Sequence, residues 1–324
     1  MRRTATFLIL CCGLACLGAA EKKPLPPIDP LDPSRIYMYP RPVENWLDVQ
    51  IALARQAISC GSIDGVGGRQ TAAGLRAFQE RAGLDTTGKL DNATRAQLIL
   101  TGPPFKQVTL SAEDLASLQP LSKTWLGKSQ QTALAHESAL ELLAERTHAH
   151  PNLLKRLNPS LDWTTITPAT RIHVPAIDRT APLGQPAHLH ISLSENTLEA
   201  RDEVGNIIMH CPVSIARLAE KRPEGELHIT VVIPNPDYTF DPDVFPESAE
   251  ARELGRKLLI QPGPNNPVGV AWIGLDRPGY GIHGTPTPEQ VGRTESHGCF
   301  RLANWDALTL LEIARVGLPV LVEP

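Results

Sequence analysis

The sequence has little of what marks several classes of protein. Aromatic residues make up only 5% of the chain, which argues against a stacking surface for single-stranded nucleic acid. The net charge is -4, with no long run of either sign, so the basic patch typical of nucleic-acid binding is absent from the sequence. Hydrophobic residues reach 42%, which argues against general disorder. We therefore expect a folded protein with no nucleic-acid partner.

A long apolar run occurs only at the start of the chain. Arg2 and Arg3 precede an apolar stretch at 7–17, and small residues follow it at 18–20. This order is typical of a secretory signal peptide, which we assign to residues 1–20 and which is too short to span a bilayer comfortably. No later run approaches the roughly 18 residues that a span needs. We therefore expect an exported protein with no transmembrane span in the mature chain.

Cysteine is also scarce, with six residues in 324. Three lie in the signal segment, and the last of them, Cys16, faintly resembles a lipid-attachment site. Gly13 stands where such sites prefer a large aliphatic residue, so lipid anchoring is the less favoured interpretation. The mature chain keeps Cys60, Cys211 and Cys299, and an odd number in an oxidising compartment leaves at least one thiol. Buried thiols are favoured for the first two, although a disulfide between them stays open.

The N-terminal half divides at changes of composition. Residues 21–42 are rich in proline and indicate an extended tether. Residues 43–102 predict a small helical domain with a first helix near 46–58, a second at 72–82 and a third at 95–100. Asp-Gly turns followed by threonine recur ahead of the second and third helices, which is typical of helix starts.

A second small module is predicted after a connector at 103–130. Residues 131–178 contain helical spacing at 138–146 and 151–157, followed by a strand that ends at Pro175. No clear strand precedes the two helices. The module is expected either to bind a ligand or to act as a spacer against the next domain.

From residue 187 the pattern changes to short strands. Residues 188–193 alternate with period two, and a helix at 305–316 and a strand at 320–322 close the chain. Further strands are expected at 197–201, 207–214, 227–233, 257–260 and 268–274. Short strands separated by Gly, Pro and Asn turns favour a mainly-β sandwich or partly open barrel.

The clearest chemical signal is one cysteine near two histidines and two glycines. Cys299 follows Ser-His-Gly, and His283-Gly284 lies upstream. A thiol becomes a useful nucleophile near neutral pH when an imidazole accepts its proton. Gly284 and Gly298 allow sharp turns, and such turns let backbone N–H groups point at a developing oxyanion. We therefore predict a cysteine nucleophile paired with a histidine base.

These residues resemble the L,D-transpeptidase family of bacterial cell-wall enzymes. The family has a histidine, a spacer of about a dozen residues and then Ser/Thr-His-Gly-Cys; here residues 284–295 separate His283 from Ser296-His297-Gly298-Cys299. The segments 260–269 and 235–238 are also similar to the family. The resemblance implies a catalytic domain at 187–324 of a mainly-β, transpeptidase-type fold.

The two N-terminal modules carry weaker resemblances. The helical module is similar to the three-helix peptidoglycan-binding domain, at Asp64-Gly65, Gly68, Thr71, Phe78-Gln79 and Gly83-Leu84. The second module is similar to a LysM module, which binds polymers of N-acetylglucosamine. Its missing first strand leaves sugar binding open. Together the resemblances imply peptidoglycan as the partner and the periplasm or cell envelope as the location.

The resemblance also implies a reaction without cofactor or metal. The Cys299 thiolate would form an acyl-enzyme with a tetrapeptide stem and release D-alanine. The acyl group would pass to an amine, either on another stem, which gives a 3→3 crosslink, or on a lysine of an envelope protein. Water as acceptor would make the enzyme an L,D-carboxypeptidase. In this scheme His283 is the general base, its ring oriented by a carbonyl near Gly284, and the N–H groups of Gly298 and Cys299 hold the oxyanion.

Other residues near the motif are assigned supporting roles. Ser296 is expected to bond the loop backbone, and His297 is expected to shape the pocket, with a second base as the alternative. Arg301 could hold a substrate carboxylate bidentately. Candidate pocket walls, for which plain packing is an equal alternative, are Tyr238, Tyr280 and Trp272.

Two alternatives of different kinds remain. In a zinc peptidase, His283, His297 and Cys299 would be ligands, but the last two are only two residues apart and no His-Glu-x-x-His pattern is present. A wall-binding protein with an inactive catalytic domain is the other alternative, and the intact His283 and Cys299 argue against it. Two treatments separate the two enzyme hypotheses: a thiol-alkylating reagent should inactivate the cysteine enzyme, and a metal chelator should inactivate the zinc enzyme.

Overall fold

The structure is a computed structural model that describes residue 28 and residues 38–177, 181–244, 249–294 and 298–324. The expected signal segment, the lipid-anchor position Cys16 and most of the tether lie outside the described residues, as do Ser296 and His297. Within the described part, no helix is both long enough and apolar enough to cross a membrane.

The N-terminal domain is built from three helices, as predicted: α1 (Trp46–Ala54), α2 (Arg69–Arg81) and α3 (Asn92–Gln97). A short antiparallel pair, β1 (Arg41–Pro42) and β2 (Ile99–Leu100), joins its ends. Asn45 and Asp91 cap α1 and α3 by accepting backbone N–H bonds, which explains where these helices begin. The third helix starts three residues earlier than the apolar spacing predicts because Asp91 caps it there.

The second module contains a strand that the sequence did not reveal. β3 (Phe105–Val108) lies inside the expected connector and pairs antiparallel with β4 (Ile172–Pro175). Between them lie four helices: α4 (Ala112–Ala116), α5 (Trp125–Ser129), α6 (Ala139–Arg146) and α7 (Pro151–Leu157). β3 ends about thirty residues before α6, and its mostly half-exposed residues carry no alternating pattern from which the strand could have been predicted.

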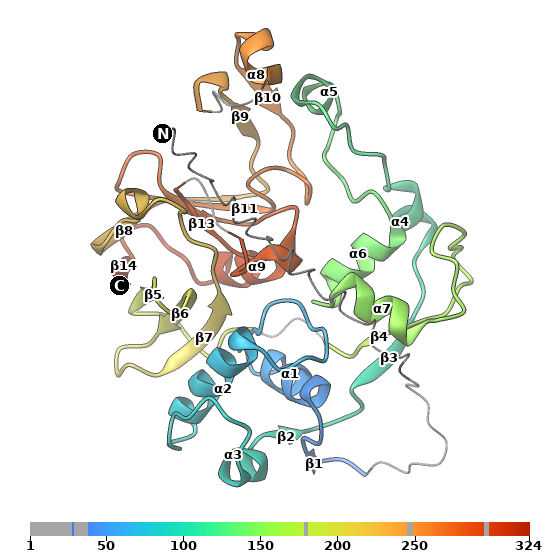
Figure 1. Cartoon of the computed structure of the whole chain (residues 1–324), viewed down its shortest axis with the longest axis vertical. Coiled ribbons are helices and arrows are strands. Elements are labelled where there is room, and N and C mark those ends of the chain that lie inside the picture. The colour runs from blue at the N-terminus through green and yellow to red at the C-terminus, as the bar shows by residue number, and fades with distance from the viewer. Residues whose placement is uncertain (1–27, 29–37, 178–180, 245–248, 295–297) are drawn as a thin grey trace, which may run out of the picture.

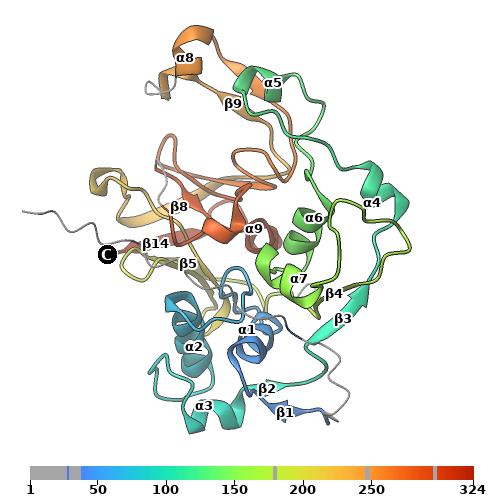
Figure 2. The ribbon, with the colours of Figure 1, turned by 45° about the vertical axis from the view of Figure 1, so that its right-hand side comes forward.

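The C-terminal domain is dominated by one eight-stranded sheet that forms a half-barrel, rather than by two facing sheets. Its strand order is β13-β12-β11-β8-β14-β5-β6-β7. The strands are β5 (His188–Ser192), β6 (Thr197–Arg201), β7 (Ile207–Pro212), β8 (Gly225–Pro234), β11 (Ala271–Leu275), β12 (Gly281–His283), β13 (Phe300–Arg301) and β14 (Pro319–Glu323). Helix α9 (Asn304–Leu311) packs on β11 and β12 and lies between the sheet and α6 (Figures 1 and 2).

A hairpin arm projects from this domain. β9 (Tyr238–Phe240) pairs with β10 (Leu258–Ile260), and α8 (Ala249–Leu254) lies at its tip. The arm meets α5 of the second module, where the rings of Trp125 and Phe240 stack with centroids 4.3 Å apart (Figure 2). Short 3-10 turns occur at Ala219–Lys221, Pro242–Val244 and Pro288–Gln290.

The two N-terminal modules share one hydrophobic core, whereas the sheet and α9 form another. The helical domain adds a short bridge to the sheet at β7, because the Ser59 N–H donates to the His210 carbonyl at 2.8 Å. The His210 N–H donates to the Ala57 carbonyl at 3.0 Å. The helical domain therefore sits against the β7 edge, at the end of the sheet opposite β13 (Figure 1).

Candidate active site

The proposed nucleophile and base lie on neighbouring parallel strands. β12 and β13 pair with Ile282 opposite Phe300 and His283 opposite Arg301. Because His283 and Arg301 are paired, their side chains lie on one face of the sheet. Cys299 lies in the bend directly before β13, and its Sγ lies 3.5 Å from the carbonyl oxygen of Gly279, in the turn before β12.

The ring of His283 is held in a defined orientation. It is buried, with 6% of its surface exposed, and its Nδ1 lies 2.6 Å from the carbonyl oxygen of Gly284. Because a carbonyl only accepts hydrogen bonds, Nδ1 carries the proton and Nε2 has the lone pair. The ring of Trp272, which lies opposite His283 on β11, stacks on the imidazole with centroids 5.7 Å apart. This neutral tautomer is the one that a general base needs at Nε2.

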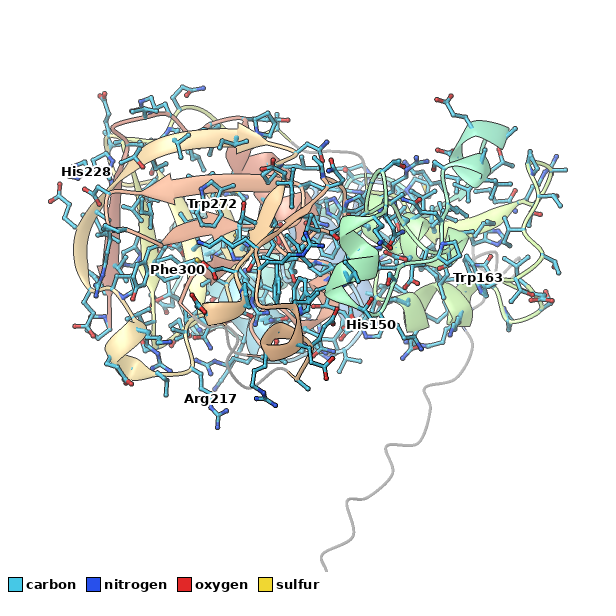
Figure 3. The ribbon with its side chains drawn as sticks, turned by 90° about the horizontal axis from the view of Figure 1, so that it is seen from above. His150, Trp163, Arg217, His228, Trp272 and Phe300 are labelled. Carbon is cyan, nitrogen blue, oxygen red and sulfur yellow. The ribbon has the colours of Figure 1, made fainter. Side chains whose placement is uncertain are left out.

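Two glycines make room for Trp272. A Cβ atom at Gly281 would lie 2.7 Å from the indole ring, and one at Gly274 would lie 3.1 Å from its Nε1. The indole therefore lies across the backbone of β11 and β12, where only residues without a side chain fit. Figure 3 shows Trp272 on the strands of the sheet, away from the helical modules that carry His150 and Trp163. The glycines thus help to fix the imidazole through Trp272.

Burial sets the protonation of the pair. It lowers the pKa of His283 to about 4, aided by the charge of Arg301 and opposed by the bond to Gly284. Burial also raises the pKa of the Cys299 thiol, opposed by a backbone hydrogen bond at Gly281 and by Arg301. Both shifts favour a neutral thiol beside a neutral imidazole. The sequence had suggested a sulfur already ionised at rest, which differs from this balance of charges.

Three of the candidate substrate-binding residues lie around the cysteine. Tyr238, on the arm, has its pKa raised first by burial and then by the charge of Cys299, so the arm reaches the site. Tyr280 lies under the guanidinium of Arg277 at 4.6 Å, and its ring would be 3.9 Å from a Cβ at Gly298. Arg301 is half-buried beside Cys299, and burial lowers its pKa while the cysteine charge opposes that shift.

Sequence analysis did not single out Asn304, which directly precedes the helix expected at 305–316. Asn304 is fully buried, and its Oδ1 accepts from the N–H of Thr285 at 3.0 Å and of Val270 at 3.3 Å. Its Nδ2 donates to Glu145 Oε2 at 3.0 Å and to the carbonyl of Pro264 at 3.1 Å. One amide thus ties together the loop after His283, the loop before β11 and helix α6.

Two further glycines leave room for the side-chain amide of Asn304. A Cβ at Gly284 would lie 2.2 Å from Asn304 Oδ1, and one at Gly269 would lie 2.1 Å from it. Gly269 also has a positive φ of 62°, which few other residues adopt. Gly284 therefore serves the site in two ways, by its carbonyl toward His283 and by its missing side chain toward Asn304.

The other two cysteines in the described part of the chain are thiols. Cys60 and Cys211 are buried and form no disulfide, and burial raises the pKa of both. Within the described residues, no three His, Cys, Asp or Glu side chains are grouped so that they could hold a metal ion. His297, one of the ligands of the zinc alternative, lies outside those residues.

Comparison with protein families finds two matches in the chain. Residues 186–322 match the L,D-transpeptidase catalytic domain of the YkuD type. Residues 43–98 match the family described as "Putative peptidoglycan binding domain".

Curated relatives carry similar descriptions. The "Putative L,D-transpeptidase YkuD" of Bacillus licheniformis is 26% identical over 57% of this chain and 93% of its own length. The "Putative L,D-transpeptidase YqjB" of Bacillus subtilis is 36% identical over 34% of this chain and 56% of its own length.

Solved structures of L,D-transpeptidases are similar to the chain only at low scores. One from Xylanimonas cellulosilytica covers 89% of this chain and 99% of its own, with 14% identity and a TM-score of 0.36. One from Mycobacterium smegmatis covers 42% of this chain and 58% of its own, with 18% identity and a TM-score of 0.33.

Proposed function

We propose that this protein is a cysteine-dependent transpeptidase of peptidoglycan. The proposal is supported by the matches to an L,D-transpeptidase catalytic domain and to a peptidoglycan-binding domain. The donor is a tetrapeptide stem, cleaved between the L-centre of diaminopimelate and the terminal D-alanine. The observation that supports the proposal is the pairing of β12, which carries His283, with β13, which directly follows Cys299; Nδ1 of His283 is bound to the Gly284 carbonyl.

In the proposed first half-reaction, the Cys299 thiol passes its proton to Nε2 of His283 as the sulfur attacks the stem carbonyl. The oxyanion that forms accepts hydrogen bonds from the N–H groups of Gly298 and Cys299. The imidazolium then gives its proton to the departing amine, D-alanine leaves, and a thioester remains. The neutral resting pair fits this order, because the proton moves only when the substrate is in place.

In the second half-reaction, an amine attacks the thioester, His283 accepts the amine proton, and the thiol is restored. The amine of another stem gives a 3→3 crosslink, and the lysine of an envelope protein gives an attached protein. Arg301 is proposed to bind a substrate carboxylate, with Tyr238 and Tyr280 as walls of the pocket. Ser296 and His297 are proposed to shape the loop that precedes Cys299.

The second module is proposed to be LysM-like. Its support is the pairing of β3 with β4 around helices α6 and α7, which supplies the strand that the sequence appeared to lack. An extracytoplasmic location, in the periplasm or cell envelope, follows from the proposed substrate.

The test is incubation of the mature chain with disaccharide tetrapeptides, with the products analysed by mass. Crosslinked dimers with free D-alanine support transpeptidation, whereas tripeptides alone support the carboxypeptidase alternative. Cys299→Ala is expected to lower D-alanine release by at least about a thousandfold. Unchanged substrate with the native chain, despite binding to sacculi, would favour the inactive wall-binding protein, and loss of activity on chelation would favour the zinc enzyme.

The pH profile tests the base. Because burial lowers the pKa of His283 to about 4, the imidazole stays neutral at any higher pH. The rate of Cys299 acylation should therefore fall on the acid side only as the pH approaches about 4, rather than near the ordinary histidine value of about 6.5. An acid limb near 6.5 would contradict the assignment of a buried, neutral His283.

A further inference from the structure

The segment that leads to Cys299 is held by the helical domain. Gln70, on α2, donates from Nε2 to the carbonyl of Val291 at 2.5 Å. The guanidinium of Arg293 lies 3.3 Å from Oδ2 of Asp64, in the loop before α2. Val291 is only 3% exposed, so the first of these bonds is largely shielded from water.

Two glycines form a slot for the side-chain amide of Gln70. A Cβ atom at Gly61, in the helical domain, would lie 2.9 Å from Oε1 of Gln70, and one at Gly292 would lie 2.5 Å from Nε2. Both glycines have a positive φ, of 73° and 68°, which few other residues adopt. A side chain at either position would displace the amide. The facing loops of the two domains are therefore shaped to receive Gln70.

Ser214, which lies two residues after β7, also holds this segment. Its Oγ accepts from the N–H of Gly292 at 2.9 Å. Its backbone N–H donates to the carbonyl of Arg301 at 2.9 Å, and the N–H of Arg301 donates to the Ser214 carbonyl at 3.0 Å. Gly292 and Arg301 lie on either side of Cys299 in the chain. One serine, only 2% exposed, therefore fixes both ends of the segment that carries the thiol.

Hydrophobic packing holds the side chain of Val291 as well. Val291 forms a small buried cluster with Ala303 and Trp305, at the start of α9. The ring of Trp305 stacks on His148 of the second module with centroids 5.2 Å apart. The side chain of Val291 is thus held by packing, and its carbonyl is held by Gln70.

Gln70 differs in this respect from charged residues of the same helix. Arg69 donates to the carbonyl of Ser194, and Arg76 pairs with Glu195, both in the turn between β5 and β6. These contacts attach the helical domain to an edge of the sheet. The bond from Gln70 instead ends on the segment that leads to Cys299.

We infer that Gln70 is a positioning residue for Cys299, so that the helical domain completes the geometry of the catalytic segment. Gln70 acts through Val291 and Gly292, whose placement sets where the segment enters the site. A displacement of about 1 Å at a reacting atom can lower a rate about a hundredfold. The catalytic consequence rests on the proposed function, whereas the restraint of the segment rests on the contacts alone.

Gln70→Met tests the inference, because methionine is as long and unbranched as glutamine but cannot donate a hydrogen bond. Arg69→Met is the matched control: it puts the same residue at the neighbouring position and removes the bond to Ser194. Ser214→Ala removes the acceptor of the Gly292 N–H and is a second, independent variant. All three changes are made in the mature chain with native Cys299.

The first measurement needs no substrate. The rate at which iodoacetamide alkylates each cysteine is followed by peptide mass at neutral pH. Cys299 is half-buried, whereas Cys60 and Cys211 are buried, so the three thiols report separately on the segment and on the fold. Gln70→Met and Ser214→Ala should each raise the rate at Cys299 at least about threefold, because a freed segment exposes the thiol. Arg69→Met should change this rate by less than about twofold.

The second measurement is the release of D-alanine from a disaccharide tetrapeptide. Gln70→Met should lower kcat at least about tenfold and change KM by less than about twofold, because the thiol is misplaced while the contacts that bind the stem remain. Arg69→Met should leave both constants within about twofold of those of the native chain.

An alkylation rate at Cys299 that Gln70→Met leaves unchanged would overturn the inference. An equal rise at all three cysteines would also overturn it, because the change would then loosen the whole fold. So would a raised rate at Cys299 with an unchanged kcat, since the segment would move without an effect on catalysis. If the native chain released no D-alanine but Gln70→Met still raised alkylation of Cys299 alone, the proposed function would fail and the restraint by Gln70 would stand.

Discussion

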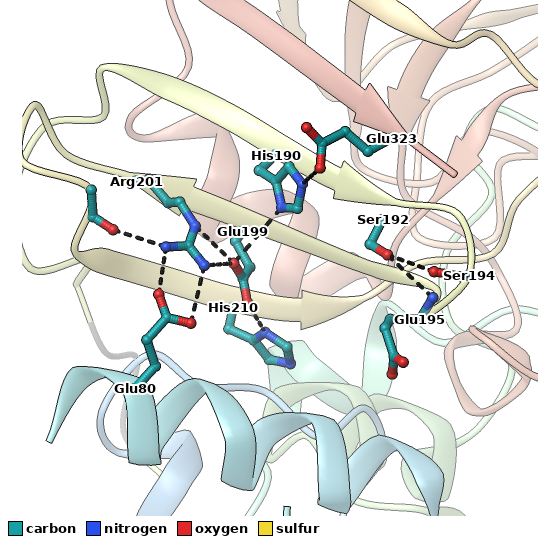
Figure 4. Close-up of polar contacts among 10 residues, drawn as sticks. Glu80, His190, Ser192, Ser194, Glu195, Glu199, Arg201, His210 and Glu323 are labelled. Carbon is teal, nitrogen blue, oxygen red and sulfur yellow. Dashed lines mark hydrogen bonds and ion pairs between the residues drawn. The ribbon is translucent and has the colours of Figure 1, made fainter. Parts of the chain in front are cut away.

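The catalytic domain is held by two N-terminal contacts of different kinds. Against the helical domain it presents a network of partly exposed charges, in which Arg201 joins Glu80 of α2 at 2.6 Å and Glu199 at 2.6 Å (Figure 4). Burial alone would raise the pKa of Glu199, but His210 and Arg201 hold it at about 2. Exposed pairs of this type each contribute little and are weakened by salt.

Against α6, the domain instead presents buried amides. Asn304 binds Glu145, and Asn265 donates to Glu141 Oε1 at 2.6 Å and to the Ala135 carbonyl at 2.9 Å. Both asparagines lie in or beside the loops that carry the proposed site. The contrast suggests that the α6 contact fixes the geometry of the site, whereas the contact with the helical domain mainly fixes its position.

The largest effect is expected from Asn304→Ala. The change removes the acceptor of the buried Thr285 N–H and of the Val270 N–H, and it removes a donor from the half-buried carboxylate of Glu145. At about 1–3 kcal/mol for each such group, the free energy of unfolding should fall by about 4 kcal/mol. Denaturant unfolding measures this change.

The same variant should lose D-alanine release even where it remains folded, because Gly284 no longer holds His283 in place. Leu311→Ala, on the same helix but outside these bonds, serves as the control for a general loss of stability. If Asn304→Ala and Leu311→Ala lost activity equally, the loss would reflect stability alone, and the α6 contact would not fix the geometry of the site.

The next effect concerns one buried acid in the contact with the helical domain. Asp306 accepts a hydrogen bond from Ser59 at 3.0 Å, and burial raises its pKa to about 8 against that bond. Its stabilising, protonated form is complete below the unfolded pKa of about 4 and is lost as the pH rises to about 8. Stability of the native chain should therefore decline between about pH 4 and pH 8.

Asp306→Asn keeps the shape without the charge, so it should raise the free energy of unfolding at pH 8 by roughly 2 kcal/mol or more and flatten this decline. Unfolding curves at several pH values measure both effects. If the free energy of unfolding of the variant still declined over this pH range, another group would be responsible for the pH dependence. Asp306 would then not be the buried group that stabilises the contact with the helical domain.

The parts of this comparison differ in how well the sequence predicts them. Helix α7 begins and ends where the sequence places it, since Pro151 at its start and Asn158 at its end act locally. The pairing of β12 with β13 cannot be read from periodicity, because strands of three and two residues are too short for a pattern. The motif containing His283 and Cys299 indicated the pair only through resemblance to a family.

The buried amides could not be predicted for a different reason. Asn304 binds Glu145 and Pro264, which lie 159 and 40 positions away in the chain. No local pattern distinguishes such an asparagine from one that begins a helix. A cavity of about 770 Å³, lined by Gly68 of the helical domain and by Asn196 and Arg293 of the C-terminal domain, is likewise formed by two domains, so neither sequence segment reveals it alone.

A smaller effect is expected from Glu145→Gln. The amide oxygen of glutamine still accepts from Asn304, but the charge that strengthens this bond is lost. The free energy of unfolding should fall by about 1 kcal/mol. Glu145→Ala should cost more, because it leaves Nδ2 of Asn304 with one acceptor fewer. If both variants matched the native chain, α6 would not support the site in the way that its contacts suggest.

The smallest effect is expected where the comparison starts, at the pair of Glu80 and Arg201. The side chain of Glu80 is 46% exposed and that of Arg201 is 20% exposed, so water and salt screen their attraction. A double-mutant cycle with Glu80→Gln and Arg201→Gln should give a coupling energy of about 0.5 kcal/mol that decreases as salt is added. A coupling above about 2 kcal/mol that salt leaves unchanged would mean that this contact is as rigid as the one at α6. The helical domain could not then adjust its position relative to the sheet.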